Sequence, residues 1–286
     1  MRYHFYIILS RLIIVTLSLL KLFFFPDPRV QGWFLFETPL PTLAMVLVYL
    51  AFVMVVGPLW MANRKPFKLQ NTLVAYNAFQ VLLSSYMFYE HLAAGWWGDY
   101  SLACQPVDYS DSDKARRMLL LCWVYYFSKL SEFADTVFFV LRKKKSQITW
   151  LHLYHHSLTP FEAWLLVKFI AGGHGTFSNV VNNMVHIIMY AYYMVAAMGP
   201  QYQKYLWWKK QLTTLQLVIA ISDTVRARFS NKLKPDCNHF KTICLQIINI
   251  SVRTSAIPVT WNQPIRIAPR LKFLKRREAL AQTLRI

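Results

Sequence analysis

LHLYHHS, residues 151–157, places three histidines within five positions: His152, His155 and His156. A helix turns by about 100° per residue, so the three imidazoles fall within roughly 100° of arc and face one region. The whole chain has 8 His, and this run adjoins an apolar segment in which polar side chains are costly and usually functional. The run is therefore the first candidate for chemistry, ahead of the alternative that it only decorates the end of an interfacial helix.

The composition around this run is typical of a membrane protein. Hydrophobic residues make up 56% of the 286 residues and aromatic residues 16%, which is more than an ordinary soluble domain contains. The formal net charge is +19, and the Lys and Arg residues gather in short loops between apolar stretches, as they do on the cytosolic side of membrane proteins. We therefore expect anionic lipid and acidic substrates as partners, and no nucleic acid. Four Cys without a C-x-x-C pair indicate neither a zinc module nor a dense disulfide scaffold.

The apolar stretches predict an all-α membrane protein, a bundle of six to seven transmembrane helices around a polar-lined cavity. We expect an atypical apolar extension at 1–26, the membrane domain at 27–225, and a basic C-terminal region at 226–286. Lys and Arg follow the first and third spans, which places those loops and the start of the histidine helix in the cytosol. The spans are expected near residues 40–61, 72–94, 118–141, 150–170, 177–198 and 212–225, with a weaker run at 242–252.

Residues 129–136, KLSEFADT, put ionisable side chains inside the third apolar stretch. Lys129, Glu132 and Asp135 lie at i, i+3 and i+6, so they share roughly 120° of one helix face. Together with Thr136 they can line a polar substrate cavity, or they can form an ion pair that only holds the bundle together.

The fifth and sixth spans carry further polar side chains. On the fifth, residues 182–193 read NNMVHIIMYAYY, and spacings of three and four align Asn182, His186, Met189, Tyr190 and Tyr193 on one face. The amide and the hydroxyls can orient the imidazole. On the sixth, Thr213 and Gln216 suit either the same cavity or polar contacts between helices. A phosphate-bearing substrate would be attracted to the cytosolic bases near the cavity mouth, which are Lys143, Lys144, Lys145, Lys209 and Lys210.

In this order and spacing, KLSEFADT, LHLYHHS, NNMVHIIMYAYY and LTTLQ (212–216) resemble four signatures of the fatty acid elongases. These signatures are K-x-x-E-x-x-D-T, H-x-x-H-H, N-x-x-x-H-x-x-M-Y-x-Y-Y and T-x-x-Q-x-x-Q, found in the ELO family of very long chain 3-oxoacyl-CoA synthases. DPRVQGWFLFETPLP (27–41) and LWWKK (206–210) resemble the insect and vertebrate members. Ile219 stands where the family has its second Gln.

The resemblance implies a multi-pass acyltransferase of the endoplasmic reticulum membrane. It implies condensation of a fatty acyl-CoA with malonyl-CoA, release of CO2 and CoA, and neither a bound cofactor nor a metal. The implied partners are acyl-CoA, malonyl-CoA, membrane lipid and the other enzymes of the elongation cycle. A homodimer is a separate possibility that the sequence leaves open. It also implies a luminal disulfide between Cys104 and Cys237, because CNHF (237–240) stands where elongases carry a luminal Cys before their last span.

No cysteine lies in the histidine run, and Cys122, on the helix face of Lys129, is expected to be a small buried hydrophobe. We therefore expect an imidazole nucleophile, His155 or His156, with His186 and the remaining imidazoles orienting groups or transferring protons. Two alternatives stay open. One is a membrane di-iron desaturase or hydroxylase, which also uses H-x-x-H-H but needs several such boxes, and the other is a transporter with a polar midplane site.

Overall fold

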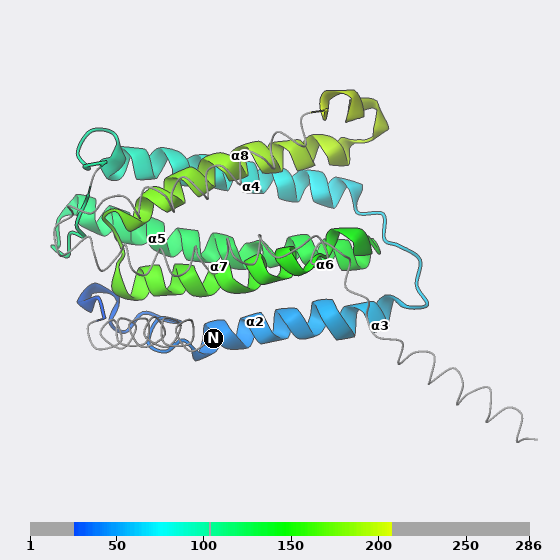
Figure 1. Cartoon of the computed structure of the whole chain (residues 1–286), viewed down its shortest axis with the longest axis horizontal. Helices are drawn as coiled ribbons and strands as arrows, with labels where there is room; N and C mark the ends of the chain where they lie inside the picture. Colours follow the sequence, from blue (N-terminus) through cyan, green and yellow to red (C-terminus); the bar gives the residue numbers. More distant parts are fainter. Residues whose placement is uncertain (1–25, 103, 208–286) are drawn as a thin grey trace, which may run out of the picture.

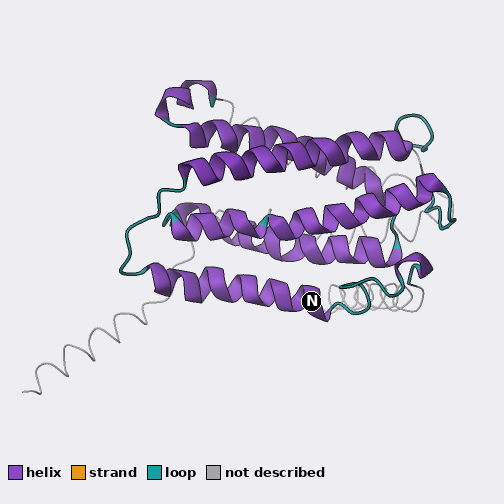
Figure 2. Cartoon of the chain, turned by 180° about the vertical axis from the view of Figure 1, so that it is seen from behind, coloured by secondary structure: helices purple, strands orange, loops and turns teal. Residues whose placement is uncertain are grey.

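The computed structural model describes residues 26–102 and 104–207, and every regular element in these ranges is a helix (Figures 1 and 2). A short 3-10 helix, η1 (Pro28–Val30), precedes five long helical segments. These segments are α2 (Leu40–Ala51), η2 (Phe52–Val56) and α3 (Gly57–Met61) in series; α4 (Gln70–His91) with η3 (Leu92–Trp96); α5 (Asp113–Ser131) with α6 (Phe133–Leu141); α7 (Trp150–Phe169) after η4 (Lys145–Gln147); and α8 (Gly175–Met198) before η5 (Pro200–Tyr205).

The five segments coincide with the first five expected spans, which confirms the all-helical prediction for this part of the chain. Leu40–Met61 and Gly175–Met198 are the two described segments that are long and apolar enough, by length and composition, to cross a membrane. The sixth and seventh expected spans lie outside the described residues. The total of six to seven helices therefore stays a prediction.

Local side-chain chemistry sets the helix boundaries. The Ser112 hydroxyl accepts a hydrogen bond from the backbone N–H of Ala115 at the start of α5, and the Thr149 hydroxyl accepts one from His152 at the start of α7. Each satisfies a backbone donor that a helix leaves unpaired in its first turn. Between α7 and α8, Gly173 has φ +55, and a Cβ there would lie 2.7 Å from the carbonyl oxygen of Gln105. The tight turn at this point therefore requires glycine.

The helical segments that contain η2 and Glu132 are interrupted, which the span ranges expected from the sequence did not show. The first contains the π-helical turn η2, followed by Pro58, which has no N–H to donate to the carbonyl four residues earlier. The third expected span is two helices, because the chain turns at Glu132 between α5 and α6. This second interruption is important for the site, since it lies inside KLSEFADT.

The segments stack in three layers (Figures 1 and 2). Helices α4 and α8 lie side by side on one side, α5, α6 and α7 form the middle, and α2 with α3 lies on the other side. The core between α5 and α7 includes Tyr126, Trp164 and Val167, each at most 1% exposed. A second core joins α2 and η2 to α6 and α7, through Tyr49, Val53, Val140 and Leu153. The two cores therefore hold the histidine helix, α7, in a fixed position against α5 on one side and against α2 and α6 on the other.

Hydrogen bonds from Asp27 and Arg29, which also form an ion pair with each other, fasten the loop before α2 to the end of α7. The Arg29 guanidinium lies 2.7 Å from the Asp27 carboxylate, and both side chains are nearly buried. Arg29 also donates to the carbonyl of Asp108 at 2.8 Å and to that of Ala171 at 3.3 Å. The backbone N–H of Asp27 donates to the carbonyl of Lys168 at 2.9 Å. The loop thus closes the end of the bundle opposite the histidines.

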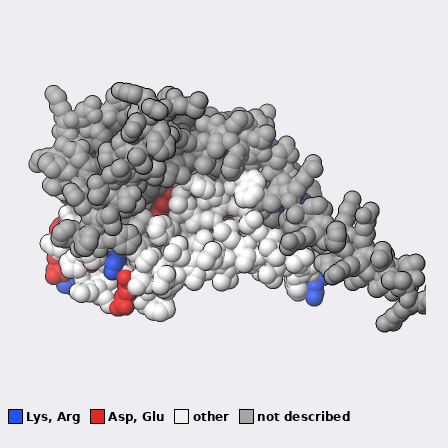
Figure 3. Space-filling view, turned by 60° about the horizontal axis from the view of Figure 1, so that its bottom comes forward, with Lys and Arg blue, Asp and Glu red and all other residues white. Residues whose placement is uncertain are grey.

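On the face that Figure 3 shows, the visible surface of the described residues is largely uncharged between its two ends. Figure 3 shows Lys and Arg atoms of the described residues near these two ends. On the outer faces, Leu47, Val48 and Leu82 are each at least 66% exposed. Such a belt is expected where a helical bundle contacts lipid hydrocarbon.

The cysteines described by the structure differ in state. Cys104 is disulfide-bonded, whereas Cys122 is a free, buried thiol within the core of α5 and α7. Cys237, the predicted partner of Cys104, lies outside the described residues, so the pairing itself stays a prediction.

Candidate active site

A buried ion pair marks the interruption between α5 and α6. The Lys129 ammonium lies 2.7 Å from the Glu132 carboxylate, and the two side chains are 1% and 2% exposed. The backbone N–H of Glu132 donates to the carbonyl of Ser128 at 3.1 Å. Two charges are removed from water here, which is stabilising only when further hydrogen bonds satisfy them. The surrounding helices supply those bonds.

Helix α8 provides partners for both members of the ion pair. Asn182 accepts a hydrogen bond from the Lys129 ammonium at 2.8 Å and another from the Tyr125 hydroxyl at 3.2 Å. Nδ1 of His186 lies 3.3 Å from the same Glu132 oxygen that Lys129 binds. If Nδ1 donates to this carboxylate, Nε2 keeps its lone pair and is available as a base. Glu132, and not Asn182 or the tyrosines as the sequence had suggested, therefore orients His186.

Asp135 is held by a different residue of α8. The Tyr190 hydroxyl donates to the Asp135 carboxylate at 2.8 Å, and the Tyr190 ring lies 5.5 Å from that of His186. Tyr193, one turn further along, has its ring 6.2 Å from that of Tyr190, and Met189 is half-buried on the same helix. The predicted polar face of the fifth span thus meets the charged face of the third.

The histidine run contacts α6 through Thr136. Nε2 of His152 is 2.8 Å from the Thr136 hydroxyl, which is itself 2.8 Å from the Tyr49 hydroxyl. The ring of His156 lies 4.2 Å from that of His152 and 5.5 Å from that of His155. The three imidazoles therefore share one region, as their spacing predicted.

Exposure distinguishes the three imidazoles. His156 is 7% exposed, and His152 is committed to Thr136, whereas His155 is exposed. Thr136 follows Glu132 by one helical turn, so α6 brings the histidine run and the charged group into one site.

Sequence reasoning missed the part that α4 plays. The Gln80 amide donates to the Ser131 hydroxyl at 2.9 Å and to the Tyr76 hydroxyl at 3.0 Å. The Tyr76 hydroxyl donates to the backbone carbonyl of Ser131 at 3.3 Å. These contacts satisfy polar groups at the interruption, where the regular helical pattern ends. Polar residues at spacings of three and four in α4, such as Asn77, Gln80 and Ser84, were the signal that could have revealed them.

The other predicted site residues are only partly described. Lys143 is half-buried, and Lys144 and Lys145 are exposed in the loop after α6. Lys209, Lys210, Thr213 and Gln216 lie outside the described residues. Within residues 26–102 and 104–207, no group of three or more His, Cys, Asp or Glu side chains could hold a metal ion.

Comparison with known proteins gives a consistent result. The family model described as "ELO: GNS1/SUR4 family" matches residues 34–255. The chain is 53% identical over 216 residues to "Very long chain fatty acid elongase AAEL008004" of Aedes aegypti, which covers 75% of this chain and 60% of that protein. It is 51% identical over 222 residues to "Very long chain fatty acid elongase 7" of Rattus norvegicus, covering 78% and 79%. Against "Very long chain fatty acid elongase 7" of Drosophila melanogaster, identity is 50% over 213 residues, covering 74% and 64%.

Proposed function

Because the chain belongs to the ELO: GNS1/SUR4 family, a family of membrane proteins of fatty acid elongation, we propose that it condenses a long or very long chain acyl-CoA with malonyl-CoA. The products are 3-oxoacyl-CoA, CO2 and CoA, which makes the protein an acyltransferase, a very long chain 3-oxoacyl-CoA synthase. The observation that carries this proposal is that the histidine run and a buried lysine–glutamate–histidine group meet at the start of α6.

The reaction divides into two steps of nucleophilic catalysis. An imidazole nitrogen attacks the thioester carbonyl of acyl-CoA, a carbon–nitrogen bond forms, and the carbon–sulfur bond breaks. CoA leaves as a thiolate that takes up one proton. Malonyl-CoA then loses CO2, its enolate carbon attacks the acyl carbon, and the imidazole leaves in its original neutral state. The net reaction consumes one proton and needs no oxidant or reductant.

We assign the nucleophile to His155. Its imidazole is exposed, while His156 is buried and His152 is bound through Nε2 to Thr136. Only an accessible nitrogen with a free lone pair can reach a thioester carbon. His152 and His156 then act as positioning groups in this scheme.

The group around Glu132 suits the second step. Decarboxylation of malonyl-CoA places negative charge on the enolate oxygen, and preorganised donors stabilise such charge strongly in a site that excludes water. Lys129, Asn182 and His186 are fixed by Glu132 and by one another. We assign to Nε2 of His186 the proton transfer that accompanies this step.

The charge distribution also supports CoA substrates. We propose that Lys143, Lys144 and Lys145, with Lys209 and Lys210, attract CoA phosphates by their summed field on the cytosolic side. The compartment is the endoplasmic reticulum membrane. The product is a 3-oxoacyl thioester, so reducing and dehydrating enzymes of the elongation cycle are the expected partners, and a homodimer stays a further prediction.

Incubation of membranes containing the chain with labelled malonyl-CoA and a panel of acyl-CoAs tests this function. We expect labelled 3-oxoacyl-CoA for at least one acyl-CoA, and none with His155→Ala at equal expression. Oxygen-dependent formation of a double bond or hydroxyl group, without malonyl-CoA, would instead support a desaturase or hydroxylase. Transmembrane flux of a solute without condensation would support the transporter.

A further inference from the structure

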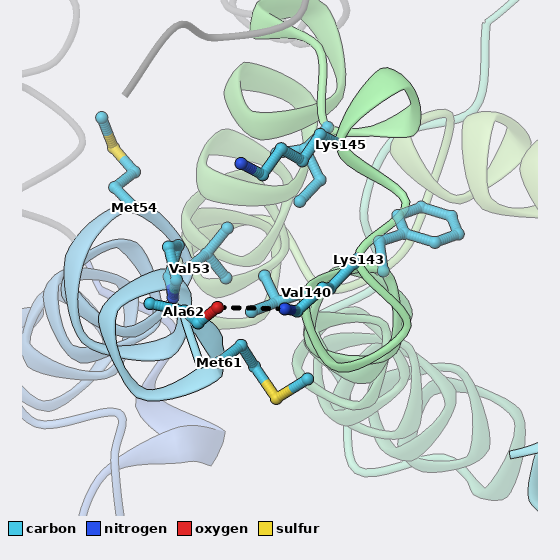
Figure 4. Close-up of a pocket in the computed structure, with 10 residues that line it drawn as sticks. Val53, Met54, Met61, Ala62, Val140, Lys143 and Lys145 are labelled. Atoms are coloured by element: carbon cyan, nitrogen blue, oxygen red, sulfur yellow. Dashed lines mark hydrogen bonds between the residues drawn. The ribbon is translucent and has the colours of Figure 1, made fainter. Parts of the chain in front are cut away.

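A pocket opens between the first and third helical segments, next to the basic loop after α6 (Figure 4). Its apolar wall includes Val53 and Met54 from η2, Met61 from α3, and Phe139 and Val140 from α6. Lys143 and Lys145 are also part of the lining. The pocket is therefore amphiphilic, with an apolar interior and two cationic side chains.

Two local features create this pocket. At Gly57 the two segments touch, because a Cβ there would lie 2.8 Å from a methyl carbon of Val140. Beyond this contact, the Lys143 ammonium bridges the segments and donates to the carbonyl oxygen of Ala62 at 3.3 Å. Lys143 has φ +55, a conformation that non-glycine residues rarely adopt. The backbone at this position thus directs a charged side chain across the gap between two helices.

The surroundings of the pocket are those of a lipid-facing surface. On the outer side of the same helical segment, Val55, Val56 and Leu59 are 53%, 54% and 51% exposed. Such side chains belong in contact with hydrocarbon. The histidine run lies beyond Phe139, whose ring is 5.5 Å from that of His152. Phe139 therefore lines the pocket and also lies next to the histidine helix.

We propose that this pocket binds an anionic phospholipid of the surrounding leaflet. The phosphate and headgroup lie near Lys143 and Lys145, and the first carbons of one acyl chain lie against Met54 and Met61. The charge of the two lysines is complementary to such a headgroup, and the cytosolic leaflet, which this end of the bundle is expected to face, carries anionic lipids. The proposal does not depend on the condensing activity. The pocket is a specific site for one lipid molecule, whereas the basic loop attracts CoA through the combined charge of its lysines.

Native mass spectrometry of the full chain, purified in detergent and supplied with phosphatidylserine or with phosphatidylcholine of the same acyl chains, tests the proposal. We expect preferential retention of phosphatidylserine. The double variant Lys143→Gln/Lys145→Gln should reduce that retention by about tenfold. The matched control Lys65→Gln/Lys144→Gln removes the same charge from exposed residues outside the described pocket lining, and it should retain the lipid within about twofold of the unmodified chain.

A second variant tests the pocket without changing charge. Met54→Trp fills the apolar wall and should also reduce retention of phosphatidylserine, with size-exclusion profile and helical content confirming that each variant is folded. Equal loss in the two double variants would show attraction by net charge alone and overturn the proposal. If Lys143→Gln/Lys145→Gln and Met54→Trp both retain phosphatidylserine as well as the unmodified chain does, the lipid binds elsewhere and the proposal is wrong. Displacement of the lipid by CoA, with loss of CoA binding in the pocket variants, would assign the pocket to the substrate instead.

Discussion

Nε2 of His152 lies 2.8 Å from the hydroxyl of Thr136, although sixteen positions and a basic loop separate the two residues in the chain. This contact joins the histidine helix to α6. At the start of α6, Glu132 and Asp135 contact His186 and Tyr190 of α8. The contact therefore fixes the distance between the two halves of the proposed site, and its removal should affect turnover more than folding.

Thr136→Val keeps the shape of the side chain and removes the hydroxyl. We expect kcat to fall by about fivefold, because a neutral hydrogen bond contributes roughly 1 kcal/mol and about 1.4 kcal/mol corresponds to a factor of ten. Thr136→Ser should retain activity within about twofold. Tyr49→Phe, which leaves the contact between Thr136 and His152 in place, should have a smaller effect than Thr136→Val. An unchanged kcat in Thr136→Val, measured by production of 3-oxoacyl-CoA, would show that this contact does not position the imidazoles.

A double-mutant cycle on Lys129 and Glu132 separates their structural and catalytic contributions. Each side chain is at most 2% exposed, so Glu132→Gln or Lys129→Met alone leaves a buried charge unpaired and should cost about 3–5 kcal/mol of stability. The double variant should be more stable than the sum of the two single effects predicts. It should nevertheless be inactive. Thermal unfolding in detergent measures the first quantity and condensation the second, and an active double variant would limit the ion pair to a structural role.

Tyr76→Phe tests whether α4 positions the interruption between α5 and α6. The variant removes the hydroxyl that donates to the Ser131 carbonyl and leaves the ring against Tyr190. We expect a loss of kcat of roughly three- to tenfold, which corresponds to one net hydrogen bond. Tyr86→Phe is the matched control, since Tyr86 is on the same helix and 52% exposed. Equal activities of the two variants would argue against a positioning role for Tyr76.

The disulfide of Cys104 should join this residue to Cys237. Peptide mapping of the non-reduced full chain should give one cross-linked pair that contains both cysteines and separates on reduction. Cys122, a free and buried thiol, should become alkylatable only after denaturation. A linkage of Cys104 to Cys244 would show that the pairing inferred from the family resemblance is wrong.

Sequence periodicity was sufficient to locate the helices but not their interruptions. The expected spans at 118–141 and 150–170 correspond to α5 with α6 and to α7, because apolar stretches of this length can satisfy their backbone only as helices. The interruption at Glu132 could not be predicted, since it is stabilised by Tyr76 and Gln80 from another helix. Tertiary contacts of this kind leave no local signal in the segment that they distort.

The residue types of the candidate site could be predicted, whereas their pairing could not. The spacing placed His186, Asn182 and Tyr190 on one face, and the structure keeps them there. Periodicity does not determine the rotation of α8 against α5, however, so Asn182 binds Lys129 and Tyr190 binds Asp135 instead of His186. The exposure of His155 relative to His156 likewise depends on packing between helices.

The most direct test of the proposed mechanism is a search for an acyl group on His155. The full chain is incubated with acyl-CoA in the absence of malonyl-CoA, quenched, digested, and the peptide containing residues 150–157 is analysed by mass spectrometry. We predict one acyl group on His155, its disappearance with formation of 3-oxoacyl-CoA when malonyl-CoA is added, and no adduct in His155→Ala. An active enzyme with no adduct, or an adduct that malonyl-CoA does not remove, would contradict an acyl-imidazole intermediate at this residue.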